Sequence, residues 1–216
     1  SNYINVFREN LKTLSKIKIE KTKKPIIGIV GEIYVRSNNF LNDNLIKAIE
    51  TLGGEAKIAT ISEWFFYTLF LEGLDLRLKS TGLTNKLNHL LRKYFYFSRE
   101  HKLLNYAKEY FPDIFEPSIY EVVEKGKTYL PEEFLGEAIL TVGRAMIFFE
   151  KENVDAVVNA SPTFCMPGTI SSYILKDIEK HYKKPIISLF YDKTGKPNLD
   201  LIPYLEILKN SISQVS

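Results

Sequence analysis

The chain has 216 residues, of which 45% are hydrophobic and 25% charged, with a formal net charge of +3 and a single cysteine, Cys165. This length suits one sizeable hydrophobic core, or a main domain with an appended lobe. The small net charge argues against nucleic-acid binding, and a lone cysteine excludes an internal disulfide framework. No apolar run approaches the roughly 20 residues that span a bilayer, and no signal peptide is evident. We therefore expect a cytoplasmic protein with neither nucleic acid nor membrane as a partner.

The first half of the chain predicts a short N-terminal segment followed by a βαβ unit. Residues 3–19 have the spacing of an amphipathic helix, and a charged linker follows to residue 24. The run 25–31 is apolar, rich in β-branched residues and typical of a buried parallel strand. A polar loop over 32–39, a helix capped by Asn42 or Asp43, and a second strand over 55–60 come next.

The stretch 62–111 predicts helices only, and we expect it to form most of a helical insertion over about 62–130. Ser62 is the expected N-cap, with breaks near Gly73 and Gly82 and a stop at Pro112. Arg and Lys side chains alternate with aromatic residues over 90–110. Such a pattern can bind single-stranded nucleic acid, but an amphipathic helix with solvated lysines is the preferred interpretation. The three histidines lack metal-ligand spacing and are expected to be exposed: His89, His101 and His181.

The C-terminal half alternates helices with strands. Helices are predicted from about residue 118, over 132–152, over 168–182 and over 198–213, and strands over 155–160 and 185–191. Alternation of this kind favours an α/β fold with a doubly wound, mostly parallel four-stranded sheet of the Rossmann or flavodoxin type. The predicted domains are an N-terminal helix and linker over 1–24 and an α/β domain over 25–216.

Polar loops follow the predicted strands, and the carboxyl ends of parallel strands share one edge of a sheet. Ligands of open α/β folds bind at that edge. The loops are 32–38, 60–64, 161–169 and 191–193, the last containing Asp192. The candidate binding residues are Glu32, Tyr34, Arg36, Asn38, Cys165, Gly168 and Thr169.

Cys165 is the candidate with the clearest chemistry. It lies between a predicted strand end and a predicted helix start, where the helix N-terminus favours a thiolate. Pro167 suits the first helical turn, and Gly168 and Thr169 offer uncovered N–H groups that can bind a thiolate, a sulfide or a phosphate. The alternative is a small buried hydrophobic side chain, as for most lone cysteines.

From about Pro25 to the C-terminus, the chain resembles proteins related to 2-hydroxyacyl-CoA dehydratases and their activators, also labelled CoA-substrate-specific enzyme activases. The matching segments, in order, are Gly28–Asn38 with Asn42–Asn44, Ser62–Trp64, Glu116–Ile119, Gly136–Leu140 with Gly143, and Cys165-Met166-Pro167-Gly168-Thr169. The last of these is the most specific.

The resemblance implies a [4Fe–4S] cluster that passes an electron to an acyl-CoA thioester, with an actin-like ATPase region or subunit as its activator. By the same resemblance, Cys165 is a cluster ligand, and the loop with Glu32, Tyr34 and Arg36 faces the same cavity. Cluster ligation takes several cysteines, and this chain has one. We therefore expect an excised domain, or a homologue that needs a partner, which holds no cluster alone.

Two alternatives remain open at this point. The domain could be a non-catalytic docking module that keeps the fold without the cluster, with 62–111 as its partner surface. A third interpretation uses Cys165 as a nucleophile, but no histidine lies near it in the sequence or at another predicted strand end.

Overall fold

The computed structural model describes residues 2–19, 22–79, 82–134 and 136–213. It divides into two compact units, which are considered separately below. One consists of 1–22 with 67–116, and the other of 23–66 with 117–216. Within the described ranges, every helix is too short or too polar to cross a membrane.

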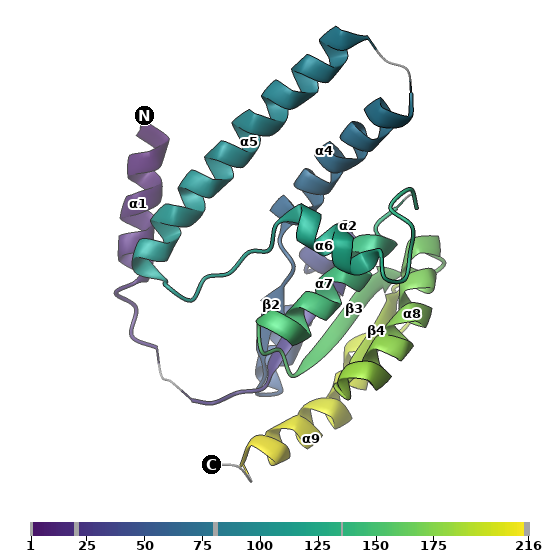
Figure 1. The fold of residues 1–216 in the computed structure, drawn as a ribbon. Coiled ribbons are helices and arrows are strands. Elements are labelled where there is room, and N and C mark those ends of the chain that lie inside the picture. The colour runs from purple at the N-terminus through teal and green to yellow at the C-terminus, as the bar shows by residue number, and fades with distance from the viewer. Residues whose placement is uncertain (1, 20–21, 80–81, 135, 214–216) are drawn as a thin grey trace. The chain divides into compact units, whose positions relative to one another are not determined.

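The larger unit is built on a four-stranded sheet (Figure 1). The strands are β1 (Ile26–Gly31), β2 (Glu55–Ile58), β3 (Ala156–Pro162) and β4 (Ile186–Tyr191). Their order is β2-β1-β3-β4, and every pairing is parallel. The chain therefore has the doubly wound α/β fold that the alternation of helices and strands predicts.

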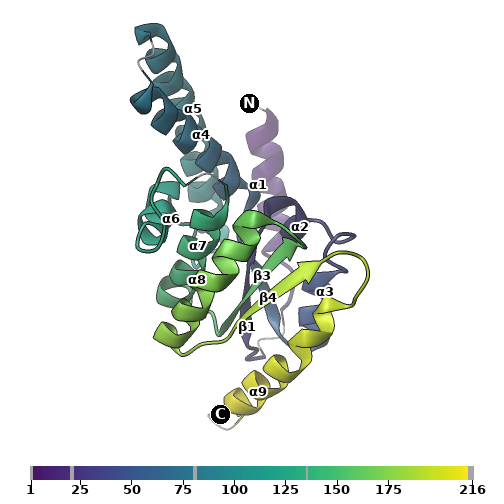
Figure 2. The ribbon, with the colours of Figure 1, turned by 90° about the vertical axis from the view of Figure 1, so that its right-hand side faces the viewer.

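Helices cover both faces of this sheet (Figure 2). Alternate strand residues such as Ile27, Ile29 and Val158 pack in one core with Leu45 of α3 (Leu45–Thr51) and Leu205 of α9 (Leu201–Ser213). The opposite face is covered by α7 (Ala138–Lys151) and α8 (Met166–Tyr182). Successive side chains of a strand point to opposite faces, so this second face receives the intervening residues.

Helix α7 lies between the sheet and α6 (Ile119–Gly126), and its residues 138–149 are all buried. Gly143 makes this packing possible, because a Cβ atom there would lie 2.0 Å from the carbonyl oxygen of Val122. The predicted start of a helix near residue 118 is confirmed, and Ser118 is its N-cap: the Ser118 side chain accepts a hydrogen bond from the Glu121 N–H at 3.2 Å. A helix with no exposed face loses the amphipathic pattern that usually locates its ends, and α7 begins at residue 138, not 132.

Local structure differs from the prediction in four places. The loop after β1 contains a short helix, α2 (Ile33–Ser37), and the chain segment before α9 forms the 3₁₀ turn η1 (Pro197–Asp200). Helix α4 (Ile61–Leu78) starts one residue before Ser62, so the hydroxyl of Thr60 takes the capping position, 3.4 Å from the Glu63 N–H. The Asn42 side chain accepts a hydrogen bond from the Leu45 N–H at 3.1 Å, although the residue at the N-cap of α3 is Asn44.

The smaller unit contains α1 (Asn2–Leu14), the part of α4 from residue 67, and α5 (Leu83–Tyr110). Arg8 of α1 forms an ion pair with Glu109 of α5 at 3.2 Å. Gly73 does not break α4, because its lack of a side chain accommodates the ring of His89, which would lie 2.9 Å from a Cβ atom there. The expectation that His89 is exposed is therefore wrong, whereas His101 and His181 are exposed as predicted.

Candidate functional site

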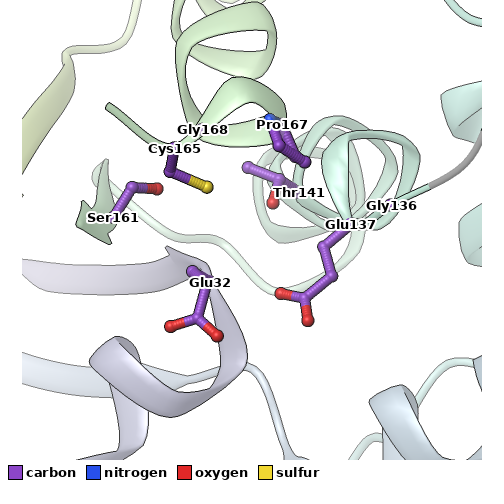
Figure 3. A pocket seen from close by; sticks show the side chains of 8 residues that line it. All are labelled: Glu32, Gly136, Glu137, Thr141, Ser161, Cys165, Pro167 and Gly168. Carbon is purple, nitrogen blue, oxygen red and sulfur yellow. The ribbon is translucent and has the colours of Figure 1, made fainter. Parts of the chain in front are cut away.

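A pocket of about 180 Å³ opens at the carboxyl ends of β1 and β3 (Figure 3). It is bounded by the residue that follows β1, by the end of β3, and by the N-terminal ends of α7 and α8. The lining residues are Glu32, Gly136, Glu137, Thr141, Ser161, Cys165, Pro167 and Gly168. This is the edge of the sheet at which open α/β folds bind their ligands.

Cys165 occupies the N-cap of α8, and its sulfur atom points into the pocket (Figure 3). The turn that holds it is fully hydrogen-bonded: its N–H donates to the carbonyl of Pro162 at 3.2 Å, and its own carbonyl accepts the N–H and the hydroxyl of Thr169, both at 2.9 Å. Phe164, just before it, has a positive φ of 65°, which is uncommon for an aromatic residue. The loop is thus shaped to present this thiol.

The floor of the pocket is formed where α8 rests on β3. A Cβ atom at Gly168 would lie 2.7 Å from the Cβ and Oγ atoms of Ser161, so the close approach requires a glycine. The Ser161 hydroxyl donates to Oδ1 of Asn159 at 3.4 Å, and the Asn159 amide reaches the Ser188 hydroxyl at 3.4 Å. A row of buried polar groups therefore leads from the sheet to the pocket.

Two carboxylates, those of Glu32 and Glu137, stand on the side of the pocket opposite Cys165 (Figure 3). Oε2 of Glu32 accepts a hydrogen bond from the Val35 N–H at 2.7 Å and caps α2. Oε2 of Glu137 accepts one from the Ile33 N–H at 2.9 Å. Burial raises the pKa of Glu137; the Ile33 hydrogen bond opposes this effect, the nearby Glu32 adds to it, and Arg36 and Trp64 lower the pKa by less. Glu137 is thus a carboxyl group that holds its proton more tightly than usual.

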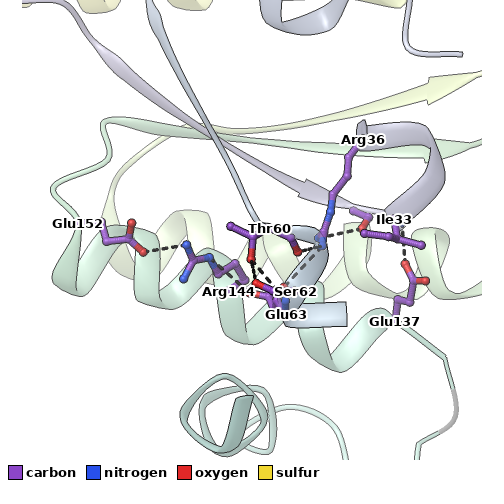
Figure 4. Close-up of polar contacts among 9 residues, drawn as sticks. Ile33, Arg36, Thr60, Ser62, Glu63, Glu137, Arg144 and Glu152 are labelled. Carbon is purple, nitrogen blue, oxygen red and sulfur yellow. Dashed lines mark hydrogen bonds and ion pairs between the residues drawn. The ribbon is translucent and has the colours of Figure 1, made fainter. Parts of the chain in front are cut away.

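Beside this pocket, a buried ion network links β2, α2, α4 and α7 (Figure 4). Glu63 lies 3.7 Å from Arg36 and 3.5 Å from Arg144, and Arg144 continues to Glu152 at 3.1 Å. Lys57 closes the chain of charges with an ion pair to Glu152 at 2.6 Å. Four of these five side chains are at least 98% buried, so each charge depends on its neighbours for solvation.

Arg36 belongs to this network and does not line the pocket. Its guanidinium donates to the carbonyl oxygen of Gly31, the last residue of β1, at 3.3 Å and to that of Thr60, two residues after β2, at 3.2 Å. Burial lowers the pKa of Arg36, although Glu63 opposes this effect. These hydrogen bonds hold the loop that carries Glu32 in place, so Arg36 supports the structure of the pocket without lining it.

The other predicted site residues are distributed as follows. Glu32, Cys165 and Gly168 line the pocket together. Three further predicted residues do not line the pocket. Tyr34 is exposed, the Asn38 side chain accepts the Phe40 N–H at 3.0 Å, and the Thr169 hydroxyl donates to the carbonyl oxygen of Cys165. Asp192 is exposed and accepts hydrogen bonds from the N–H and hydroxyl of Thr194 at 2.8 and 2.6 Å, which lower its pKa.

Sequence reasoning gave Glu137 no role, although Gly136–Leu140 is one of the segments that carry the family resemblance. The usual signal for a functional carboxylate at this edge is a position just after a strand. Glu137 instead precedes α7, and only the tertiary packing of α7 against the sheet brings it to the pocket. Ile33, whose N–H the Glu137 carboxylate accepts, lies 104 residues away in sequence, so this contact leaves no local pattern.

The donor set of the pocket was tested against the [4Fe–4S] cluster that the resemblance implies. Cys165 is the single thiol of the sequence, and cluster irons in proteins are held by several thiolates. Among the described residues, no group of three His, Cys, Asp or Glu side chains is placed to hold a metal ion. The pocket therefore offers one ligand, and these residues do not hold a cluster by themselves.

Comparisons of the chain with protein-family models, with curated proteins and with solved structures found no match.

Proposed function

We propose that this chain is the dehydratase-like α/β domain of an acyl-CoA dehydratase and activase system. In this proposal Cys165 supplies one thiolate to an iron–sulfur centre that a partner segment or subunit completes. The observation that carries the proposal is the placement of Cys165 itself: the thiol is at the N-terminus of a 17-residue helix, at the ligand-binding edge of the sheet, and aimed into a pocket.

The surroundings of the thiol support a site that a second surface completes. The two neighbours of Cys165, Phe164 and Met166, are 98% and 63% exposed. Large apolar side chains on both sides of a metal-binding thiol would shield an iron–sulfur centre from water once a partner covered them. Such a partner would have to contribute the remaining thiolates, because the sequence contains no second cysteine.

Each residue of the pocket has a role in this proposal. A bound cluster would supply single electrons to the thioester carbonyl of a 2-hydroxyacyl-CoA substrate. The free N–H groups at the start of α8 would donate hydrogen bonds to sulfur, and Ser161 would fix the floor beneath them. Glu137, with its raised pKa, would hold or release a proton on the opposite wall. In this proposal the actin-like ATPase region or subunit is the electron source, and the setting is the reducing cytoplasm.

Anaerobic reconstitution with iron and sulfide tests the ligand assignment. The chain alone should bind iron at background level, and its complex with an actin-like activator and the cysteine-bearing partner should acquire a cluster with its visible absorption and electron paramagnetic resonance signals. Cys165→Ala should lower the iron content of that complex, whereas Tyr173→Phe, at an exposed residue of the same helix, should leave it unchanged. An unchanged iron content in Cys165→Ala would show that Cys165 is not a ligand.

A second candidate function is a docking module that keeps the pocket without a cluster. The presence of one thiol where a cluster needs several favours it. The two candidates differ in the same experiment, since a docking module would form the complex with or without Cys165 and would add no iron to it.

A further inference from the structure

The N-terminal half of α5 carries a row of large apolar side chains on its surface. Leu83, Leu87, Leu90 and Tyr94 are 82%, 54%, 58% and 76% exposed. We call these four residues the α5 stripe. Their spacing of four, three and four residues places them on one face of an α-helix. Single exposed apolar residues are ordinary, but a row along one helix face marks an interaction site.

The α5 stripe faces away from α4, the helix against which α5 packs. Contacts with α4 are made by His89, whose Nδ1 lies 3.1 Å from Oε2 of Glu72, and by Arg92, which forms an ion pair with the same carboxylate. At roughly 100° per residue, these two side chains lie about 130° and 170° around α5 from the centre of the stripe. The contacts that hold α5 to α4 therefore leave the stripe exposed.

The charged residues that flank the stripe have one sign. The sequence from Leu83 to Arg99 contains no acidic residue. Its basic residues are Lys86, Arg92, Lys93 and Arg99. Lys86 and Lys93, seven residues apart, lie on one side of the stripe, about 70–90° from its centre, whereas Arg92 and Arg99 lie on the opposite face, where they contact Glu72 and Tyr3. The unit as a whole shows the same bias, with 13 Lys and Arg against 8 Asp and Glu in 1–22 and 67–116, compared with 16 against 18 in the rest of the chain.

We infer that the α5 stripe is the docking site for an amphipathic helix of a partner protein whose flanking residues are acidic. The four-three-four spacing is the one with which two helices interlock side chains, and charges repeating every seven residues beside such a seam select the partner. A second copy of this chain is a poor occupant, because pairing two α5 stripes would bring together two units that each carry an excess of basic residues. A flat anionic lipid surface would require basic residues but not their seven-residue repeat. This inference does not depend on the proposed function.

Binding of two synthetic three-heptad peptides to the full chain tests the inference. Both carry leucine at the seam positions; one has glutamate and the other lysine at the flanking positions. Isothermal calorimetry should show the glutamate peptide binding at least about tenfold more tightly than the lysine peptide at low salt. Leu87→Asp together with Leu90→Asp should abolish this binding, whereas Leu199→Asp, at an exposed leucine of the larger unit, should not. Circular dichroism should show all variants folded.

Charge reversal distinguishes charge-specific recognition from nonspecific hydrophobic binding. Lys86→Glu together with Lys93→Glu should weaken binding of the glutamate peptide and strengthen that of the lysine peptide. The inference is overturned if the two peptides bind equally. It is also overturned if the chain binds neither peptide but sediments with phosphatidylserine-containing vesicles, or if the leucine substitutions instead dissociate a dimer of this chain.

Discussion

Nε of Arg144 lies 3.5 Å from Oε2 of Glu63, and both side chains are almost wholly buried. Glu63 also faces Arg36, so one carboxylate balances two guanidinium groups inside the protein. Removing one partner of a buried ion pair leaves an uncompensated charge, which costs about 3–5 kcal/mol. We therefore predict that Glu63→Gln lowers the free energy of unfolding by that amount, measured by urea denaturation.

The matched control for this prediction is an exposed pair in the same unit. Asp177 and Lys180 lie 3.3 Å apart on the surface of α8, and Asp177→Asn should cost less than about 1 kcal/mol. Equal and small losses in Glu63→Gln and Asp177→Asn would mean that the network contributes no more than surface charges do.

The raised pKa of Glu137 predicts how its contribution to stability changes with pH. Because the folded protein holds this proton more tightly than the unfolded chain, the contribution is complete below the ordinary pKa of a glutamate and is lost as the pH rises through the raised value. Glu137→Gln removes this titration and can still accept the Ile33 hydrogen bond. Its free energy of unfolding should therefore rise relative to the parent between pH 4 and pH 8.

Glu137→Ala is the control for that comparison. It removes the acceptor for the Ile33 N–H and should cost about 1 kcal/mol at the acidic end of the range. If the difference between Glu137→Gln and the parent were the same at pH 4 and pH 8, burial would not be shifting this carboxyl group.

Glu100, on α5, titrates in an accessible range. Burial raises its pKa to about 7, and the nearby Glu116 contributes to the shift. The side-chain carboxyl ¹³C shift should report half-titration near pH 7, and Glu116→Gln should lower that midpoint without returning it to 4.5, because burial is the larger cause. This group favours the folded state below pH 4.5 and loses that contribution as the pH rises to about 7. A midpoint near 4.5 in the parent protein would contradict the burial of Glu100.

The contact between α6 and α7 predicts a position-specific intolerance of side chains. Gly143→Ala would bring a methyl group within 2.0 Å of a main-chain oxygen, so the two helices must separate. We expect a loss of at least about 1–3 kcal/mol in thermal or urea unfolding. Gly195→Ala is the comparison, since a Cβ atom there meets nothing within 4 Å. Similar stabilities for the two variants would show that α6 and α7 are less tightly packed.

The strands and their direction could be predicted because their signals are local. Ile26–Gly31 and Ile186–Tyr191 are short apolar runs bounded by Pro, Gly or polar residues, and such runs alternate with helices only in parallel sheets. The cap at Ser118 is equally local, since the acceptor and donor lie three residues apart. Local signals also predict the position of Cys165, between the end of a strand and the start of a helix at the carboxyl edge of the sheet.

The positions of the Arg36 and His89 side chains differ from what the sequence suggests, and in both cases the cause is tertiary packing. Arg36 follows a strand, as a ligand-binding residue would, but its side chain turns toward charges that come from α4 and α7. His89 lies in a charged stretch, yet a glycine on the neighbouring helix makes room to bury it. Neither outcome has a signature within a few residues of the side chain concerned.

The smaller unit joins chain segments that are far apart in sequence. Tyr3 contacts Arg99, and Arg8 contacts Glu109, pairs separated by 96 and 101 residues. Closing so long a loop has an entropic cost that only later contacts offset, which slows folding. On the ribosome, α1 emerges well before α5 exists, and strands β1 and β2 are synthesised in between. The apolar face of α1 must therefore stay in solution, or on a chaperone, until α5 has been synthesised.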